Sequence, residues 1–94
     1  MIYQVVKSTR FKKDFDKCIK RGLDQTKLEE IVELLRNGSS LPEKYQDHPL
    51  KSSKDFVDCR ELHIEPNWLL VYKYIDEFVV LYLVRTGTHS DLFR

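Results

Sequence analysis

The C-terminal part of the chain constrains the fold most, because three strand-like segments follow one another there with only short connections between them. The segments span 56–64, 68–74 and 78–85, and β-branched and aromatic residues are frequent in them. Connections as short as 65–67 and 76–77 join neighbouring antiparallel strands. The sequence therefore predicts an antiparallel meander of three strands.

Residues 2–7 predict another short strand, and the segment after it predicts an amphipathic helix. Ser8 is expected to cap this helix and Gly22 to end it. Its apolar residues are spaced at i, i+4, i+7 and i+8, which places them on one side of the helix. They are Phe11, Phe15, Cys18 and Ile19.

A second helix is predicted from Thr26, which can form a capping box with Glu29. The residue pair 37–38, Asn-Gly, is expected to end it. Its apolar stripe consists of Leu28, Ile31, Val32 and Leu35. The stretch 39–54 shows no periodicity, and a loop of this length in so small a chain predicts a functional role.

The order β-α-α-β-β-β predicts an α+β fold. Two antiparallel helices should pack on one face of a four-stranded, mainly antiparallel sheet, and the other face should be free for a ligand. The 94 residues suffice for a single domain, 1–94. The segment 86–94, which follows the last strand, could form a single helical turn.

The charge is unevenly distributed, although the net charge is only +1. Residues 1–27 contain eight Lys or Arg and three Asp, which gives a net charge of +5. The basic side chains of the first helix lie opposite its apolar stripe, and they are Arg10, Lys13, Lys17, Lys20 and Arg21. Such a face is either ordinary solvated surface or a surface that contacts a polyanion such as RNA.

Several classes of protein are not expected. No apolar run is long enough to span a membrane, and the start of the chain lacks the pattern of a signal peptide. Cys18 and Cys59 are expected to be buried free thiols in the reducing cytoplasm. Because phosphate-binding and nucleophile motifs are absent and the histidines lack metal-ligand spacing, we expect no cofactor and no metal site.

The polar residues that remain include three histidines, His48, His63 and His89. Side chains alternate along a strand, so Glu61 and His63 should share the face opposite the helices. Arg85 is expected near the same rim.

Cleavage of RNA without a metal needs a base, an acid, cations for the phosphate, and aromatic faces that hold a nucleotide. Histidine can serve as base or acid near neutral pH. Trp68 and Phe93 could supply the aromatic faces. Taken singly, packing is the more ordinary explanation for each aromatic residue, and a surface or structural role is the more ordinary one for each histidine. These residues permit RNA cleavage without selecting it.

Three motifs favour RNA cleavage, because they resemble a known family. DHPL at 47–50, CRELHIEPNWLLVYK at 59–73 and RTGTHSDLF at 85–93 resemble the YafQ family, which are RelE-type toxins of bacterial type II toxin–antitoxin modules. The N-terminal part fits this family only in its pattern of one strand and two helices. The resemblance implies a RelE-like fold and a cytoplasmic, metal-independent endoribonuclease that inhibits translation by cleaving mRNA in the ribosomal A site.

The resemblance also implies roles for single residues. The family's functional histidines fall on His48, His63 and His89, with His89 as the general acid. Further expected catalytic residues are Glu61 and Arg85, and the expected RNA-binding residues are Phe93, Trp68, Asn67, Lys51, Lys13, Lys17 and Lys20. Asn67 stands where the family often has Asp, so it cannot be a base but can still donate a hydrogen bond to RNA.

The implied partners are a cognate antitoxin, the ribosomal RNA and the mRNA, with no membrane. DNA is not an expected partner of the toxin alone, whereas the toxin–antitoxin complex can bind operator DNA. The alternative is a module of the same fold that binds RNA or a partner protein without catalysis.

Overall fold

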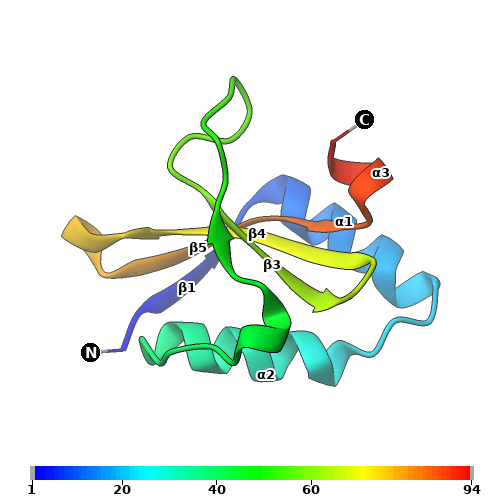
Figure 1. Cartoon of the computed structure of the whole chain (residues 1–94), viewed down its shortest axis with the longest axis horizontal. Helices are drawn as coiled ribbons and strands as arrows, with labels where there is room; N and C mark the ends of the chain where they lie inside the picture. Colours follow the sequence, from blue (N-terminus) through cyan, green and yellow to red (C-terminus); the bar gives the residue numbers. More distant parts are fainter. Residues whose placement is uncertain (1, 94) are drawn as a thin grey trace.

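The computed structural model describes residues 2–93; Met1 and Arg94, the ends of the predicted domain 1–94, lie outside the described residues. The elements follow one another as shown in Figure 1. They are β1 (Gln4–Lys7), α1 (Thr9–Lys20), α2 (Gln25–Arg36), η1 (Glu43–Tyr45), β2 (His48–Pro49), β3 (Arg60–Glu65), β4 (Trp68–Ile75), η2 (Asp76–Phe78), β5 (Val80–Gly87) and α3 (His89–Leu92).

The sheet is mixed and has the strand order β1-β5-β4-β3-β2. The predicted meander is confirmed, because β3, β4 and β5 pair antiparallel in sequence order. β1 pairs with β5 in parallel. The prediction of four strands was one short: β2 pairs with β3 in the stretch predicted as a loop. A strand of two residues is too short to show an alternating pattern.

The helices begin and end largely as predicted. The Ser8 hydroxyl accepts a hydrogen bond from the backbone N–H of Phe11 at 2.9 Å, which confirms the cap of α1. The predicted start of α2 at Thr26 is wrong, because Asp24 is the cap and accepts hydrogen bonds from both the backbone N–H and the hydroxyl of Thr26. Asn37 is the C-terminal cap of α2, as expected.

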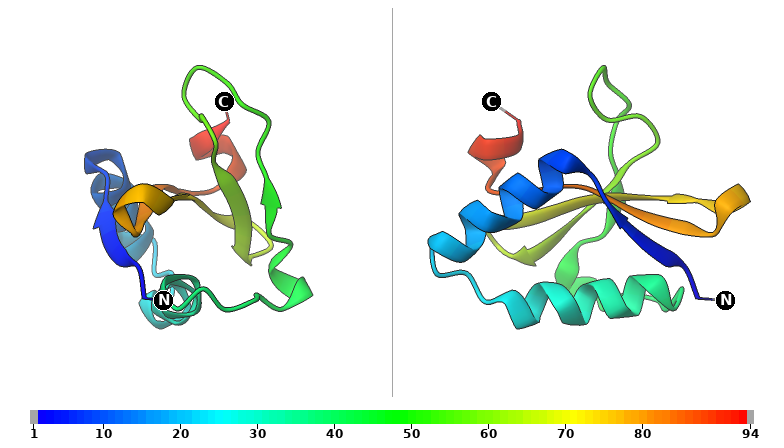
Figure 2. Two further views of the ribbon diagram at one scale, coloured as in Figure 1. Left: turned by 90° about the vertical axis from the view of Figure 1, so that its left-hand side faces the viewer. Right: turned by 180° about the vertical axis from the view of Figure 1, so that it is seen from behind.

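Both α1 and α2 pack on the same face of the sheet, as predicted, and the two views of Figure 2 show them crossing it at different angles. The main core forms between these helices and strands β3, β4 and β5. Its buried members are Phe11, Cys18, Leu28, Ile31, Leu35, Leu62, Ile64, Trp68, Leu70, Tyr72, Leu81 and Leu83.

The opposite face of the sheet is only partly free, which corrects the prediction. A second apolar cluster covers it, built from Phe56, Cys59, Leu69, Val71 and Leu92. The long loop before β3 supplies Phe56 and Cys59, and α3 supplies Leu92. The segment 50–59 rises above the sheet beside α3 in Figure 1. This second cluster shapes the site described below.

Cys18 and Cys59 are buried free thiols, as predicted, and burial raises the pKa of both. Over residues 2–93, no helix combines the length and the apolar character that crossing a membrane would require.

Candidate functional site

Three of the predicted site residues, together with Val71, form one row across the sheet. His48 pairs with Glu61, Glu61 with Val71, and Val71 with Arg85. Directly opposite residues on neighbouring strands point to the same face. The pairing of β2, β3, β4 and β5 therefore brings His48, Glu61 and Arg85 to the face that carries the second apolar cluster.

A bulge in β5 is the reason that Arg85 joins this row. Val71 lies opposite Arg85, whereas the next residue, Tyr72, lies opposite Leu83, so Val84 is an extra residue. Leu83 belongs to the main core beneath the helices. With strict alternation Arg85 would point to that core as well, and the bulge turns it to the opposite face.

A second row lies next to the first. His63 pairs with Leu69, and Leu69 pairs with Gly87. The backbones of His63 and Gly87 are thus separated by two strand spacings of about 4.8 Å each. Since α3 begins two residues after Gly87, the fold places His89 at the end of the sheet that carries His63.

The Glu61 carboxylate lies between two histidines. Its Oε1 atom is 3.7 Å from Nε2 of His48 and 3.7 Å from Nε2 of His63. These are ion-pair rather than hydrogen-bond distances. The Glu61 side chain is only 5% exposed, compared with 47% for His48 and 23% for His63. A buried carboxylate is thus flanked by two imidazoles that solvent and a ligand can reach.

Hydrogen bonds to carbonyl groups orient both imidazoles. Nδ1 of His48 lies 2.6 Å from the carbonyl oxygen of Gln46, and Nδ1 of His63 lies 3.3 Å from that of Pro66. Because a carbonyl only accepts, each Nδ1 must carry the proton. Nε2 of each ring is then the atom that can gain or lose a proton, and it is the atom that faces Glu61.

Asp47 holds β2 in place. Its carboxylate accepts a hydrogen bond of 2.6 Å from the Tyr72 hydroxyl and one of 3.0 Å from Nη2 of Arg60. Burial, together with the Asp47 carboxylate, raises the pKa of Tyr72 well above its ordinary value, so the phenol remains a donor. These contacts fix the residue next to His48 to both β3 and β4.

Arg85 is bound by Asp14 of α1. Nε and Nη2 of Arg85 donate to the two carboxylate oxygens at 2.9 and 2.8 Å, and the backbone N–H of Thr86 donates to the same carboxylate at 3.2 Å. The Arg85 side chain is 16% exposed. The guanidinium is thus fixed in direction, and only a small part of it is open to a ligand.

α3 presents His89 next to aromatic side chains. The rings of His89 and Phe93 are 5.1 Å apart, and those of Phe93 and Phe56 are 5.6 Å apart. Phe93 is 40% exposed. A small hollow of about 400 Å³ between the loop and α3 is lined by both Lys51 and Phe93, two of the predicted RNA-binding residues.

Asp91 anchors α3 to α1. Arg21 donates two hydrogen bonds to its carboxylate, at 2.7 and 3.3 Å. This pairing and the backbone N–H of Thr88 hold the pKa of Asp91 well below its ordinary range. Arg21, which the sequence placed on the basic face of the first helix, therefore forms an ion pair with Asp91.

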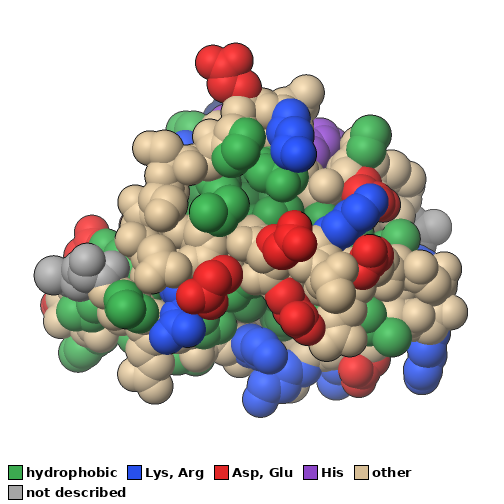
Figure 3. Space-filling view, turned by 90° about the horizontal axis from the view of Figure 1, so that it is seen from below, with side chains coloured by type: hydrophobic (Ala, Val, Ile, Leu, Met, Phe, Trp, Pro, Cys, Tyr) green, Lys and Arg blue, Asp and Glu red, His purple; other side chains and the backbone are tan. Residues whose placement is uncertain are grey.

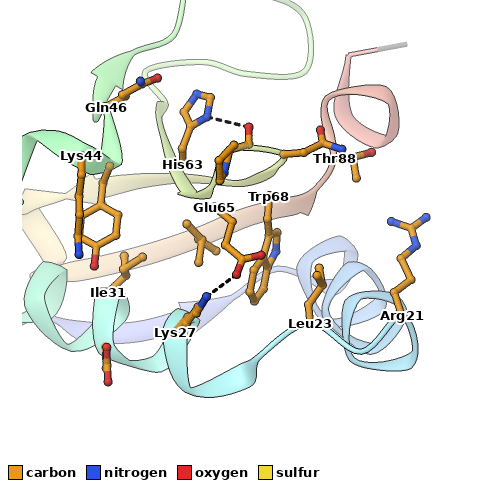
Figure 4. Close-up of a pocket in the computed structure, with 15 residues that line it drawn as sticks. Arg21, Leu23, Lys27, Ile31, Lys44, Gln46, His63, Glu65, Trp68 and Thr88 are labelled. Atoms are coloured by element: carbon orange, nitrogen blue, oxygen red, sulfur yellow. Dashed lines mark hydrogen bonds and ion pairs between the residues drawn. The ribbon is translucent and has the colours of Figure 1, made fainter.

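A larger cleft of about 1000 Å³ opens on the helix side of the β3–β4 turn. In Figure 4 the side chains of Lys27 and Glu65, 2.5 Å apart, meet inside it, and the His63 ring lies at its rim. Asn67 is exposed in the turn and also lines the cleft. The cleft thus adjoins the two-histidine site without containing Glu61.

Trp68 differs from the expectation of an RNA-binding aromatic residue. It is 1% exposed, belongs to the main core, and donates its indole N–H to the Thr86 hydroxyl at 2.9 Å. The packing interpretation, which the sequence also allowed, describes its place. Its indole is not available as a stacking surface.

The predicted basic face is exposed. Lys13, Lys17 and Lys20 all lie on the solvent side of α1. Figure 3 views the molecule from the side of α2, where acidic side chains gather over the middle of the face and Lys and Arg side chains follow its lower edge. Other basic side chains on this side pair with acidic ones, as Arg36 does with Glu33 and Lys27 with Glu65.

Sequence reasoning missed Asp14 and Asp91. Asp14 follows Phe11 by three residues and precedes Cys18 by four, so it lies within the apolar stripe of the helix. A carboxylate at such a position signals a buried partner. Thr88 and Asp91 have the spacing of a capping box, which the structure contains.

Comparison with known proteins identifies the family. The family model for the "Bacterial toxin of type II toxin-antitoxin system, YafQ" matches residues 3–94. The mRNA interferase toxin YafQ of Escherichia coli (strain B / BL21-DE3) is 44% identical over 87 residues, which are 92% of this chain and 90% of the relative.

Two solved structures have nearly the same fold. The E. coli DinJ–YafQ toxin–antitoxin complex matches with a TM-score of 0.88 and 38% identity over 100% of both chains. A metal-bound toxin from Helicobacter pylori matches with a TM-score of 0.89 and 40% identity, covering 99% of this chain and 100% of that one. In residues 2–93 of this chain no group of three or more His, Cys, Asp or Glu side chains is arranged to hold a metal ion.

Family model, sequence relatives and solved structures agree over almost the whole chain. The two solved structures share the fold described above, with TM-scores of 0.89 and 0.88. The chain belongs to the YafQ family of toxins from bacterial type II toxin–antitoxin systems.

Proposed function

We propose that this protein is an mRNA interferase, a toxin that inhibits translation by cutting mRNA in the ribosomal A site. The observation that carries the proposal is the Glu61 carboxylate between His48 and His63, on the same face as α3. Two similar proteins from E. coli are named mRNA interferase toxins.

The proposed reaction is a transesterification within the RNA. A base on the sheet, the His63–Glu61 pair, removes the proton of a ribose 2′-hydroxyl, and that oxygen attacks the adjacent phosphorus. The bond from phosphorus to the 5′ oxygen breaks, and His89 donates a proton to the leaving oxygen. The products are a 2′,3′-cyclic phosphate and a 5′-hydroxyl. All atoms and charges balance without a metal.

Charge stabilisation and positioning complete the scheme. Arg85 faces the site and donates to the developing phosphorane through the part of its guanidinium that Asp14 leaves free. A nucleotide base stacks on Phe93 in the hollow that Lys51 also lines, and Lys51 contacts a phosphate. Asn67 donates a hydrogen bond to the RNA at the neighbouring turn.

The ribosome supplies the remaining binding energy. Lys13, Lys17 and Lys20 form an exposed row on α1 that can neutralise phosphates of ribosomal RNA and release their counterions. An antitoxin is the second partner, as in the DinJ–YafQ complex of a similar protein. The proposed compartment is the cytoplasm, where mRNA is translated. The toxin alone is not expected to bind DNA, whereas its complex with the antitoxin can bind operator DNA.

The experiment compares wild type with His89→Ala in a reconstituted translation system. Toeprinting should show cleavage of translated mRNA by wild type and about 10²-fold slower cleavage by the variant, and EDTA is added only in the separate assay of naked RNA. Naked RNA should remain intact. Efficient, EDTA-sensitive cleavage of naked RNA would contradict ribosome dependence and metal independence together. Ribosome binding by wild type without any cleavage would instead support the non-catalytic module.

A further inference from the structure

α3 is too short to be stable by itself. It comprises only His89–Leu92, and its backbone hydrogen bonds run from Leu92 N–H to Thr88 and from Phe93 N–H to His89. One turn of helix does not offset the cost of its nucleation in water. Since α3 carries His89 and precedes Phe93, contacts outside the turn must determine where these two side chains point.

The first external contact is apolar. Leu92 is 7% exposed and lies in the second apolar cluster together with Phe56 and Leu69. Leu92, together with the contact between the Phe93 and Phe56 rings, holds the C-terminal end of the turn, whereas His89 and Ser90 at its start are exposed. A second contact, away from Leu92, is needed to set the direction of His89.

The second contact is the Arg21–Asp91 pair. Nη1 and Nη2 of Arg21 donate to Oδ2 and Oδ1 of Asp91 at 2.7 and 3.3 Å. Oδ2 also accepts the backbone N–H of Thr88 at 2.9 Å, so one carboxylate joins the start of α3 to the end of α1. Arg21 is the C-terminal cap of α1, a helix held in the main core by Phe11 and Cys18.

Gly87 makes the close approach of this carboxylate possible. Its φ of +151° is a conformation that residues with a side chain rarely adopt, and a Cβ atom there would lie 2.8 Å from Oδ2 of Asp91. The backbone is therefore shaped to leave room for Asp91 at this point. The Arg21–Asp91 pair therefore depends on the end of β5 as well as on α1 and α3.

We propose that Arg21 is a positioning residue, which fixes α3 through Asp91 and thereby sets the directions of His89 and Phe93. The effect on cleavage rests on the proposed function, whereas the effect on α3 does not. An exposed arginine at the end of α1 thus determines where His89 and Phe93, at the opposite end of the chain, are held.

The structural test measures amide hydrogen exchange at Leu92 and Phe93 by NMR. Arg21→Gln should accelerate both about three- to fivefold, because an exposed ion pair contributes modestly. Lys12→Gln removes one charge from the same exposed helix and should change neither amide. Arg21→Lys, which keeps the charge but loses the paired donors, should fall between wild type and Arg21→Gln. Amides of β4 and β5 should remain protected in all variants, which shows that each is folded.

The dependence of amide exchange on ionic strength tests whether Arg21 acts through its ion pair with Asp91 or only through packing. Raising the ionic strength should accelerate exchange at Leu92 and Phe93 in wild type, because it screens the exposed pair, and should have little effect in Arg21→Gln. Equal exchange in Arg21→Gln and Lys12→Gln, or equal salt dependence in wild type and Arg21→Gln, would overturn the inference.

The functional test measures single-turnover cleavage on ribosomes at saturating enzyme, so that binding does not contribute. Arg21→Gln should slow cleavage about tenfold with unchanged ribosome affinity, and Lys12→Gln less than about twofold. If wild type does not cleave mRNA, the proposed function is wrong, and the exchange experiment still decides the role of Arg21. If Arg21→Gln loosens α3 without slowing cleavage, the positioning of His89 is refuted while the proposed function stands.

Discussion

Asp14 and Arg85 are joined by two hydrogen bonds, of 2.9 and 2.8 Å, across the edge of β5 that β1 leaves uncovered. β1 pairs with β5 only as far as Leu83, and the Asp14 carboxylate then takes the next backbone donor, the N–H of Thr86. A side chain from α1 thus accepts a backbone hydrogen bond from β5 beyond the point where the pairing with β1 ends. The same carboxylate sets the direction of an arginine on the candidate site.

Asp14→Ala should destabilise the protein. The change leaves the nearly buried Arg85 guanidinium and the Thr86 N–H without their partner, which costs about 2–4 kcal/mol in the free energy of unfolding. Urea denaturation measures it. Asp16→Ala, an exposed position on the same helix, is the control and should stay within about 0.5 kcal/mol of wild type. Equal stability of the two variants would show that the buried pair contributes nothing.

The three histidines should contribute unequally to cleavage. We expect His89→Ala to slow single-turnover cleavage about 10²-fold or more with nearly normal ribosome binding, because a general acid acts in the transition state. His48→Ala should cost less, since His48 lies at the exposed end of its row. A rate for His89→Ala within about threefold of wild type would move the acid role to His63 with Glu61.

Gly87→Ala should impair both stability and cleavage. The new Cβ would push Asp91 away from Thr88 and force a backbone conformation that costs about 1–3 kcal/mol. Gly38→Ala is a matched control, because Gly38 also has a positive φ, of +70°, but its Cβ would meet nothing within 4 Å. We expect Gly38→Ala to lower the thermal midpoint while cleavage by the folded protein is unchanged. Equal loss of cleavage in both variants would refute a local effect on α3.

The Arg21–Asp91 pair should make α3 sensitive to acid. The pKa of Asp91 is depressed in the folded protein, so the stabilisation is present above the unfolded value of about 4 and is lost as the pH falls below it. Amide exchange at Leu92, corrected for its intrinsic pH dependence, should therefore accelerate below about pH 4. Asp91→Asn keeps an oxygen acceptor for the Thr88 N–H and should abolish this dependence. A pH profile of Asp91→Asn identical to that of wild type would contradict the prediction.

The basic row on α1 should matter for docking rather than for chemistry. Reversing Lys13, Lys17 and Lys20 to Glu should weaken ribosome binding and reduce its dependence on salt, because fewer counterions are released. A control variant reverses three exposed lysines outside α1, namely Lys7, Lys44 and Lys54, and has the same net charge. Sedimentation with ribosomes over a range of salt concentrations compares the two. Identical salt slopes would mean that only the net charge matters.

The parts of the fold that depend on local sequence could be predicted. Ser8 caps α1 through a contact three residues away, and the meander follows from its short turns. β2 could not be predicted, because its two residues are held by Asp47, whose partners Arg60 and Tyr72 lie elsewhere in the chain.

In the candidate site too, the features that depend on local sequence could be predicted and those that depend on distant contacts could not. Alternation along one strand correctly placed Glu61 and His63 on the face opposite the helices. The approach of His48 to Glu61 depends on the register between strands, and the direction of Arg85 depends on the bulge at Val84. Trp68 lies in the main core, where its indole N–H donates to Thr86, a partner 18 residues away that no local pattern signals.

The parallel pairing of β1 with β5 has a consequence for how the chain folds as it is synthesised. β1 is synthesised first, yet the strand with which it pairs, Val80–Gly87, emerges from the ribosome after every other strand described here. A sheet closed by so distant a pairing folds late and slowly compared with one built from local contacts. The nascent chain therefore cannot close its sheet until Val80–Gly87 has emerged, and His89 follows that strand in the sequence.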